Sequence, residues 1–273
     1  MNEAIEIEDD VNFRAPAASK RLEPSAHQQA IFDWIARGQG DALVNAVAGS
    51  GKTTTLVEAS KRLPNNTSSI FCAFNSHIVK ELSARLQGME CKTIHSIGLA
   101  TVRRHLGHLV PMDDSRCKNK YRDLVRREAW KLAEQMPTVS RQELTSALGE
   151  LVDLCQATLA VRCRAMGGTL ENALEGLRAL VSHFGLQTPC PVEKIAPSVL
   201  SVLAQGIQLA KEEHVIIFGD MLWLPWVWEL RPEIFDWVFV DECQDLNRAQ
   251  LEMVLKLRAR PHVDRVITGN WKA

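Results

Sequence analysis

The chain has 273 residues, of which 46% are hydrophobic and 24% are charged, and its formal net charge is −1. This length suits one large domain or two small ones, and the composition is that of a soluble globular protein. No apolar run approaches the ~20 residues of a membrane span, and the acidic N-terminus is the reverse of a signal peptide. We therefore expect a cytoplasmic protein that makes no contact with a membrane.

The seven cysteines lie at irregular spacing and form no C-x-x-C pair. This pattern predicts reduced thiols, with neither a disulfide framework nor a structural metal site. The small net charge leaves nucleic acid open as a partner, because binding depends on a local basic patch and not on the sum of the charges.

Residues 1–23 are polar and at first acidic, which predicts a flexible lead-in. A helix should begin after them, with Ser25 as its N-cap. Gln28 on this helix carries an amide that offers both a donor and an acceptor, as recognition of adenine requires. An ordinary solvated helix residue is the alternative, and only the segment that follows favours the nucleotide role.

An apolar run from Ala42 to Val47 leads into a turn of small residues, after which Lys52 and Thr53 open a helix. A strand, turn and helix in this order predict a phosphate-binding loop, whose backbone N–H groups and helix N-terminus attract phosphate oxygens. Lys52 is placed to reach the β- and γ-phosphates, and Thr53 to hold Mg²⁺. A Gly/Ser-rich loop before a surface helix is the alternative. The predicted nucleotide-binding residues are Gln28, Ala48, Gly49, Ser50, Gly51, Lys52, Thr53 and Thr54.

Two further strands are expected at Ser69–Phe74 and Cys91–Ile94, the first of them followed by a helix from Ile78 to Leu86. Strands that alternate with helices predict a parallel sheet, in which the strand ends and the turns after them line the ligand crevice. Residues at these two ends are therefore placed to contact a second ligand near the nucleotide, and they are Phe74, Asn75, Thr93 and His95.

From residue 101 to residue 214 the pattern becomes helical, which predicts an all-helical subdomain inserted into the sheet domain. Helices are expected around 118–135, 170–184 and 192–213, and after a capping box from Ser140 to Glu143. The first part of the insert, from Arg103 to Lys131, is rich in basic residues. This run is either a solvated helix face or a patch that contacts a phosphate backbone.

Two apolar segments follow the insert. The Trp-rich stretch from Met221 to Trp228 could stack bases, but its continuous apolar character favours packing under the sheet. Trp237–Val240 then predicts a buried strand that ends in Asp241 and Glu242. Asp241 can hold the Mg²⁺ that Thr53 also contacts, and Glu242 can orient or deprotonate the attacking water. Together with the phosphate loop, these acids predict a nucleoside triphosphate hydrolase.

The complete set of motifs resembles the first motor domain of the UvrD/Rep-like superfamily 1 DNA helicases, over roughly residues 24–270. The segments that match its motifs, in chain order, are Gln28, Ala48–Thr53, Ala73–Asn75, Thr93–Ser96 and Asp241–Asp245. The resemblance implies a RecA-like P-loop NTPase fold of class α/β, with a parallel sheet flanked by helices. It implies a motor domain made of residues 24–100 and 215–273 and a helical insert at 101–214.

The resemblance also implies a function. ATP and Mg²⁺ would be the cofactors and single-stranded DNA the partner, contacted through Phe74, Asn75, Thr93 and His95. Lys52 and Glu242 would act in catalysis, and Gln244 would couple the γ-phosphate to DNA movement. Unwinding in this family needs a second motor domain with arginine fingers.

The end of the sequence departs from the family pattern, because Asn270 stands where the family has Asp and the nucleotide-sensing Gln is absent. We therefore expect a half-motor that hydrolyses ATP poorly alone, with a separate chain as the possible source of the second domain. The alternative is a non-catalytic remnant that binds nucleotide or DNA. A small-molecule kinase is disfavoured, because nothing suggests a lid for an acceptor substrate.

Overall fold

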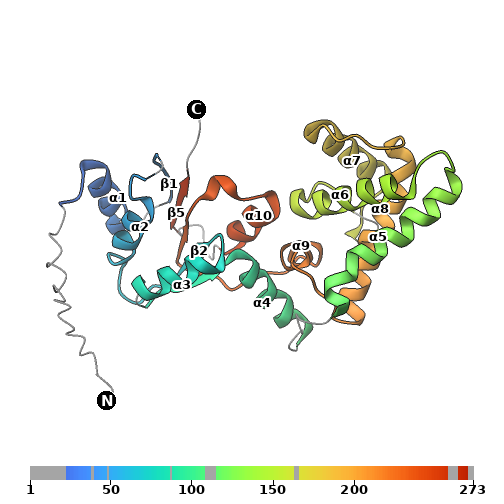
Figure 1. The fold of residues 1–273 in the computed structure, drawn as a ribbon. Helices are drawn as coiled ribbons and strands as arrows, with labels where there is room; N and C mark the ends of the chain where they lie inside the picture. The colour runs from blue at the N-terminus through green and yellow to red at the C-terminus, as the bar shows by residue number, and fades with distance from the viewer. Residues whose placement is uncertain are drawn as a thin grey trace, which may run out of the picture.

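The computed structural model describes residues 23–37, 40–47, 49–86, 88–107, 115–162, 166–257 and 264–269. All of the predicted lead-in except Glu23 lies outside this part of the chain. Figure 1 shows a sheet with its covering helices at one end of the molecule and a cluster of helices at the other. Helices α4 (Ile94–Leu106) and α9 (Asp220–Val227) lie between the two.

The sheet is parallel, as predicted, and its strands run in the order β1-β5-β4-β2-β3. The strands are β1 Asp41–Asn45, β2 Ser69–Ala73, β3 Glu90–Thr93, β4 Trp237–Val240 and β5 Asp264–Gly269. The first three strands end one or two residues earlier than the apolar runs suggested. At β3 the reason is local, because the Thr93 hydroxyl accepts from the Ser96 N–H and so starts α4 at Ile94.

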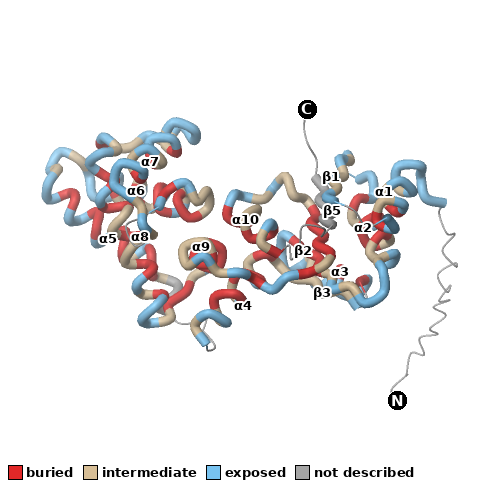
Figure 2. Tube along the Cα trace, turned by 180° about the vertical axis from the view of Figure 1, so that it is seen from behind, coloured by how far each residue is buried: buried red, intermediate tan, exposed pale blue. Residues whose placement is uncertain are grey.

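Residues that alternate along the strands form the two faces of the sheet, each with its own core. Phe71 and Phe239 pack on one face with the helices α1 (Ala26–Arg37), α2 (Lys52–Ser60) and α3 (Ser76–Arg85). Cys72 and Val240 pack on the other face, against α4, α9 and α10 (Arg248–Lys256). The result is a three-layer α/β arrangement, with β2 and β4 buried along nearly their whole length (Figure 2).

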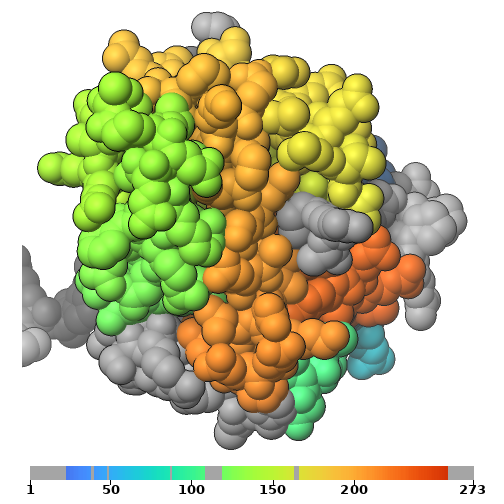
Figure 3. Space-filling view, turned by 90° about the vertical axis from the view of Figure 1, so that its right-hand side faces the viewer, coloured from blue at the N-terminus to red at the C-terminus, as the bar shows by residue number. Residues whose placement is uncertain are grey.

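The helical cluster has its own apolar core and consists of α5 Ser115–Gln135, α6 Arg141–Thr158, α7 Leu170–Phe184 and α8 Val192–Glu212. The expected helices are confirmed, and the capping box between Ser140 and Glu143 is present. Figure 3 shows α8 (orange) between α5 (green) and α7 (yellow). Val102 of α4 belongs to this core as well. The domain boundary predicted at residue 101 falls inside α4 and stays a prediction.

The Trp-rich stretch forms α9, and most of it packs in a different place from the one expected. Trp223 is fully buried within the core of the helical cluster, whereas only Leu222 joins the core under the sheet. The prediction of a buried role is confirmed for Trp223, and the prediction of a position under the sheet is wrong. A continuously apolar helix can be buried on all sides, so α9 can pack against the core of the helical cluster and the core under the sheet at the same time.

No helix in the described part of the chain has the length and apolar character that crossing a membrane requires. Within the same residues there is no group of three or more His, Cys, Asp or Glu side chains that could hold a metal ion. The cysteines whose side chains are described are free thiols.

Candidate functional site

The phosphate loop follows β1 and leads directly into α2. Gly49 and Gly51 have φ angles of 75° and 81°, in the left-handed region that glycine adopts at little cost. A Cβ on either residue would meet no atom within 4 Å, so the backbone angle alone calls for glycine. The Ser50 N–H donates to the Val47 carbonyl at 3.3 Å and closes the turn. Ala48, also predicted to bind nucleotide, lies outside the described residues.

The first two residues of α2 each contact an acidic residue at the end of β4. The Thr53 hydroxyl donates to Oδ2 of Asp241 at 2.7 Å. The ammonium Nζ of Lys52 lies 3.6 Å from Oε1 of Glu242, and the Lys52 side chain is only 6% exposed. Because β1 and β4 both pair with β5, the carboxyl edge brings the phosphate loop and the acids together.

Glu242 has a φ of 52°, which is uncommon for a residue other than glycine and costs about 1–3 kcal/mol. Its N–H donates to Oδ1 of Asp241 at 3.0 Å, and its Oε2 accepts from the Gln244 amide at 2.7 Å. Burial, together with the neighbouring carboxylates, raises the pKa of the Cys243 thiol to about 11. The thiol therefore stays protonated at neutral pH and is no nucleophile.

Gln28 lies beside α2, with its amide engaged at both ends. Its Nε2 donates to the Thr55 hydroxyl at 3.0 Å, and its Oε1 accepts from the Ser25 N–H at 2.9 Å. An amide has two N–H donors and two lone pairs, so these contacts leave capacity for a base. Thr54 is exposed, and its hydroxyl accepts from Nη2 of Arg85 at 3.4 Å. Adenine recognition by Gln28 stays a prediction.

The donor set fits a magnesium-bound triphosphate. Mg²⁺ prefers oxygen ligands and keeps several waters, and the Thr53 hydroxyl and the Asp241 carboxylate already converge within hydrogen-bonding distance. Lys52 adds a buried positive charge at the N-terminus of α2, where backbone N–H groups favour an anion. The residues present can therefore bind the phosphates and the metal ion together.

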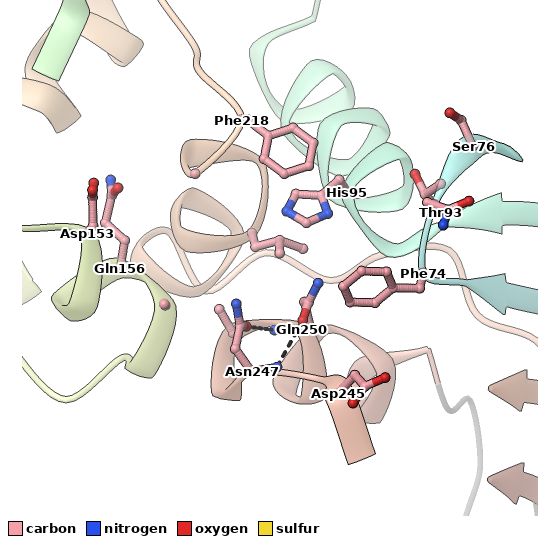
Figure 4. A pocket seen from close by; sticks show the side chains of 15 residues that line it. Phe74, Ser76, Thr93, His95, Asp153, Gln156, Phe218, Asp245, Asn247 and Gln250 are labelled. Carbon is pink, nitrogen blue, oxygen red and sulfur yellow. Dashed lines mark hydrogen bonds between the residues drawn. The ribbon is translucent and has the colours of Figure 1, made fainter. Parts of the chain in front are cut away.

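A cavity of about 690 Å³ lies at the ends of β2 and β3, apart from the phosphate loop. The four residues predicted to contact DNA all line it, and they are Phe74, Asn75, Thr93 and His95. Figure 4 shows Phe218 against His95, with Phe74 nearby and the α6 residues Asp153 and Gln156 on the far side. The cavity is therefore shared between the sheet layer and the helical cluster.

Aromatic side chains, from Phe74, His95 and Phe218, line part of this cavity, which we call the aromatic cavity. The His95 imidazole stacks on the Phe218 ring with centroids 3.7 Å apart and planes inclined by 16°. Phe218 and Phe74 are 64% and 47% exposed, so both rings have faces open to a ligand. Burial lowers the pKa of His95 to about 4, which keeps the imidazole neutral at neutral pH. Exposed aromatic faces of this kind stack bases of single-stranded nucleic acid.

The other two predicted contacts also have a structural role. Asn75 Oδ1 accepts from the Ile78 N–H at 2.9 Å and caps α3, and Thr93 Oγ1 accepts from the Ser96 N–H at 3.1 Å and caps α4. These caps fix the starts of two helices that border the cavity. Contact of either side chain with nucleic acid stays a prediction.

The described lining of the cavity contains no Lys or Arg and includes two acids, Asp153 and Asp245. Phosphate groups would be repelled from such a lining, whereas uncharged base rings would not. If a nucleic acid binds here, its bases enter the cavity and its phosphates remain at the rim.

The basic run from Arg103 to Lys131, interpreted as either a solvated helix face or a phosphate-contacting patch, is in part structural. The Lys120 side chain is fully buried and pairs with Asp220 at 2.6 Å, so its assignment to a phosphate patch is wrong. Arg126 pairs with Asp123 at 3.4 Å, and Lys131 with Glu128 at 2.8 Å. Sequence spacing could not distinguish these local pairs from free cations.

Gln244 connects the two sites. It lies in the short 3₁₀ helix η2 (Cys243–Asp245), and its Nε2 donates to Glu242 at 2.7 Å and to Asp245 at 3.3 Å. Asp245 lines the aromatic cavity, and Glu242 pairs with Lys52. A continuous chain of polar contacts therefore runs from the phosphate loop to the cavity.

Phe218 is the main site residue that sequence reasoning missed. It lies just before the apolar run of α9, where one more aromatic residue carries no pattern of its own. The available signal was its position before Gly219 and Asp220, because a glycine and an acid at a helix start mark a turn that can present a side chain.

Comparison with protein-family models matches residues 27–268 to the UvrD/REP helicase N-terminal domain. Comparison with curated proteins finds no match. The matched residues include the phosphate loop, the residues that line the aromatic cavity and the acidic residues at the end of β4. The chain therefore belongs to the UvrD/REP helicase N-terminal domain family.

Proposed function

We propose that this helicase-type ATP-binding domain binds Mg²⁺-ATP at the phosphate loop and single-stranded DNA in the aromatic cavity. We further propose that binding at one site affects the other through Gln244. The observation that carries the proposal is the chain of contacts from Lys52 through Glu242 and Gln244 to Asp245. Two unrelated pockets would not require a direct polar connection between them.

Each side chain at the nucleotide site has a definite task in this proposal. Lys52 and the N–H groups at the start of α2 bind the phosphates, while Thr53 and Asp241 hold Mg²⁺. The bound metal ion supplies positive charge that offsets the charge developing on the phosphate oxygens. Glu242 orients the attacking water or accepts its proton, once Lys52 moves from Glu242 to the phosphates.

Turnover also needs charge on the far side of the γ-phosphate. In enzymes of this chemistry an arginine finger contributes on the order of 10³–10⁵ in rate. We propose that a second motor domain supplies it and that translocation and unwinding require that domain. Hydrolysis by residues 1–273 alone should therefore be slow, and Glu242→Gln should abolish any rate that the second domain restores.

The test measures the affinity of the purified chain for each of the two ligands. Lys52→Ala removes a charge-assisted contact worth about 1.5–3 kcal/mol, so affinity for Mg²⁺-ATP should fall at least tenfold by calorimetry. Lys61→Ala is the control, because Lys61 is exposed and pairs only locally with Glu58. Equal affinities in the wild type and Lys52→Ala would refute the nucleotide site.

DNA binding is measured as the affinity for a single-stranded oligo-dT by fluorescence anisotropy. Phe74→Ala should weaken binding by about 1–3 kcal/mol if a base stacks on the ring. Phe184→Ala is the matched control, because Phe184 has a similar exposure, 46%, and lies on α7 outside the cavity lining. If both variants bind like the wild type, the cavity is not the DNA site. A chain that binds nucleotide but no DNA would instead be the nucleotide-binding remnant.

A further inference from the structure

We propose that Asp220 is a positioning residue for the aromatic cavity, because its buried bonds to the helical cluster fix the Phe218 ring against His95. The role in nucleic-acid binding rests on the function proposed above, whereas the positioning of the ring does not. The helical cluster would thereby determine the shape of a pocket whose remaining aromatic residues belong to the sheet layer.

The Asp220 side chain has no exposed surface and accepts hydrogen bonds from α5, from α6 and from the turn before α9. Lys120 of α5 donates to Oδ2 at 2.6 Å and Tyr121 of α5 donates to Oδ1 at 2.8 Å. Gln156 of α6 donates to Oδ1 at 3.4 Å, and the Ile217 N–H donates to Oδ2 at 3.0 Å. A buried carboxylate requires such partners, and losing one of them leaves an uncompensated polar group.

The partners of Asp220 are themselves held firmly. Tyr121 packs over Gly206 of α8, where a Cβ would come within 2.7 Å of the tyrosine ring. Lys120 also donates to the Val215 carbonyl at 2.9 Å, so it ties both ends of the 215–220 segment to α5. The segment therefore has little freedom to move relative to the helical cluster.

Phe218 lies inside this fastened segment, two residues before Asp220. The residue is 64% exposed, so burial cannot fix the position of its ring. The residue between them, Gly219, lies so close to Gln156 that a Cβ would be 2.8 Å from Oε1. The backbone next to Phe218 is thus fixed by Asp220 and Gln156, and the ring meets the His95 imidazole at 3.7 Å.

A simpler explanation of the Asp220 cluster, which is Asp220 with Lys120, Tyr121 and Gln156, makes a different prediction. If the cluster only stabilises the fold, its loss should lower the melting temperature without a specific effect on Phe218. Its place in the chain favours positioning, because the carboxylate binds the Ile217 N–H and so bridges the turn that carries Phe218. A residue that acts through another should lose its effect when the second residue is removed.

The experiment is a double-mutant cycle between the cluster and Phe218. Removing Asp220 alone would leave Lys120 charged and buried, so the double variant K120M/D220N removes both charges, and Tyr121→Phe removes one bond with the ion pair intact. Phe218→Ala and K120M/D220N should each weaken binding of an oligo-dT strand about tenfold, with Tyr121→Phe smaller. Combining K120M/D220N with Phe218→Ala should give no further loss.

Leu177→Ala is the control for general damage to the helical cluster, because Leu177 is fully buried in α7 within the same core. It should lower thermal stability and leave oligo-dT affinity unchanged. Additive losses in the combined variant, about a hundredfold in total, would overturn the positioning role.

A DNA-free measurement separates this inference from the proposed function. Nuclear magnetic resonance of the His95 ring protons reports the stacked Phe218 ring through its ring-current shift. The shift should be lost in Phe218→Ala, largely lost in K120M/D220N and retained in Leu177→Ala. An unchanged shift in K120M/D220N would overturn the inference. If the wild type binds no oligo-dT, the proposed function fails and this shift alone decides the positioning role.

Discussion

Two helical glycines should respond in opposite directions to the same substitution. Gly98 lies in α4 and Gly149 in α6, and alanine is favoured over glycine inside a helix by about 1 kcal/mol. A Cβ at Gly149 would meet only a methyl group of Val125, at 3.9 Å. A Cβ at Gly98 would collide with the Met221 carbonyl group, whose carbon would be 2.9 Å away.

At Gly98 the collision outweighs the gain in helix propensity, so the substitution should lower stability. Overpacking of a core costs about 1–3 kcal/mol, and a backbone carbonyl cannot rotate away as a side chain can, so the upper part of this range applies. After the gain in helix propensity, Gly98→Ala should destabilise the chain by about 2 kcal/mol and lower the melting temperature by about 4–8 °C. Gly149→Ala should stabilise it by up to ~1 kcal/mol, a rise of about 2–4 °C.

The assay is thermal and urea unfolding of both variants beside the wild type, with oligo-dT affinity as a second measurement. Because α4 carries His95 and α9 follows Phe218, separating the two helices at Gly98 should also weaken binding in the aromatic cavity. Gly149→Ala should leave this affinity unchanged. If Gly98→Ala were as stable as Gly149→Ala, the close approach of α4 and α9 would be wrong.

Two further predictions follow from the site. The lowered pKa of His95 means that the unfolded chain takes up its proton near pH 6.5 and the folded chain only near pH 4, so stability should fall as pH drops through this window. The free energy of unfolding, measured with urea at several pH values, should change less with pH in this window for His95→Asn, whose amide does not titrate. The cavity acids Asp153 and Asp245 are present in both chains, so their contribution is shared. Gln244→Ala should keep Mg²⁺-ATP affinity but remove the effect of oligo-dT on it, a coupling of about 1–3 kcal/mol in typical allosteric pairs. Calorimetry with and without the strand measures this coupling, and an unchanged coupling would exclude Gln244 as the connection.

The residues that meet at the carboxyl edge of the sheet could be named from the sequence because each half of the candidate nucleotide site is encoded locally. Glycines at positive φ, a lysine and a threonine define the phosphate loop within a few residues, and two acids after an apolar strand define the other half. A parallel sheet places both at its carboxyl edge, which is why a contact between Thr53 and Asp241 could be expected across 188 residues.

The aromatic cavity was predicted only in part, because its walls come from segments with no shared pattern. Phe74 and His95 follow strands and were found by that rule, whereas Phe218 depends on a turn that is fastened by buried partners on α5 and α6. Lys120 shows the same difficulty. It belongs to a basic run in the sequence, and only the position of Lys120 beside Asp220 reveals that its charge is buried and paired.

The unusual backbone at Glu242 follows from the demands of both sites. Successive residues of an extended strand point to opposite faces, so Asp241 and Glu242 could not both reach α2 if β4 simply continued. The left-handed conformation at Glu242 turns the chain, so that Asp241 meets Thr53 while Glu242 meets Lys52. The same turn begins η2, which carries Gln244 back to Glu242 and Asp245 into the lining of the cavity. Glycine would adopt this backbone with less strain, but it would remove the carboxylate on which both the Lys52 pair and the Gln244 bond depend.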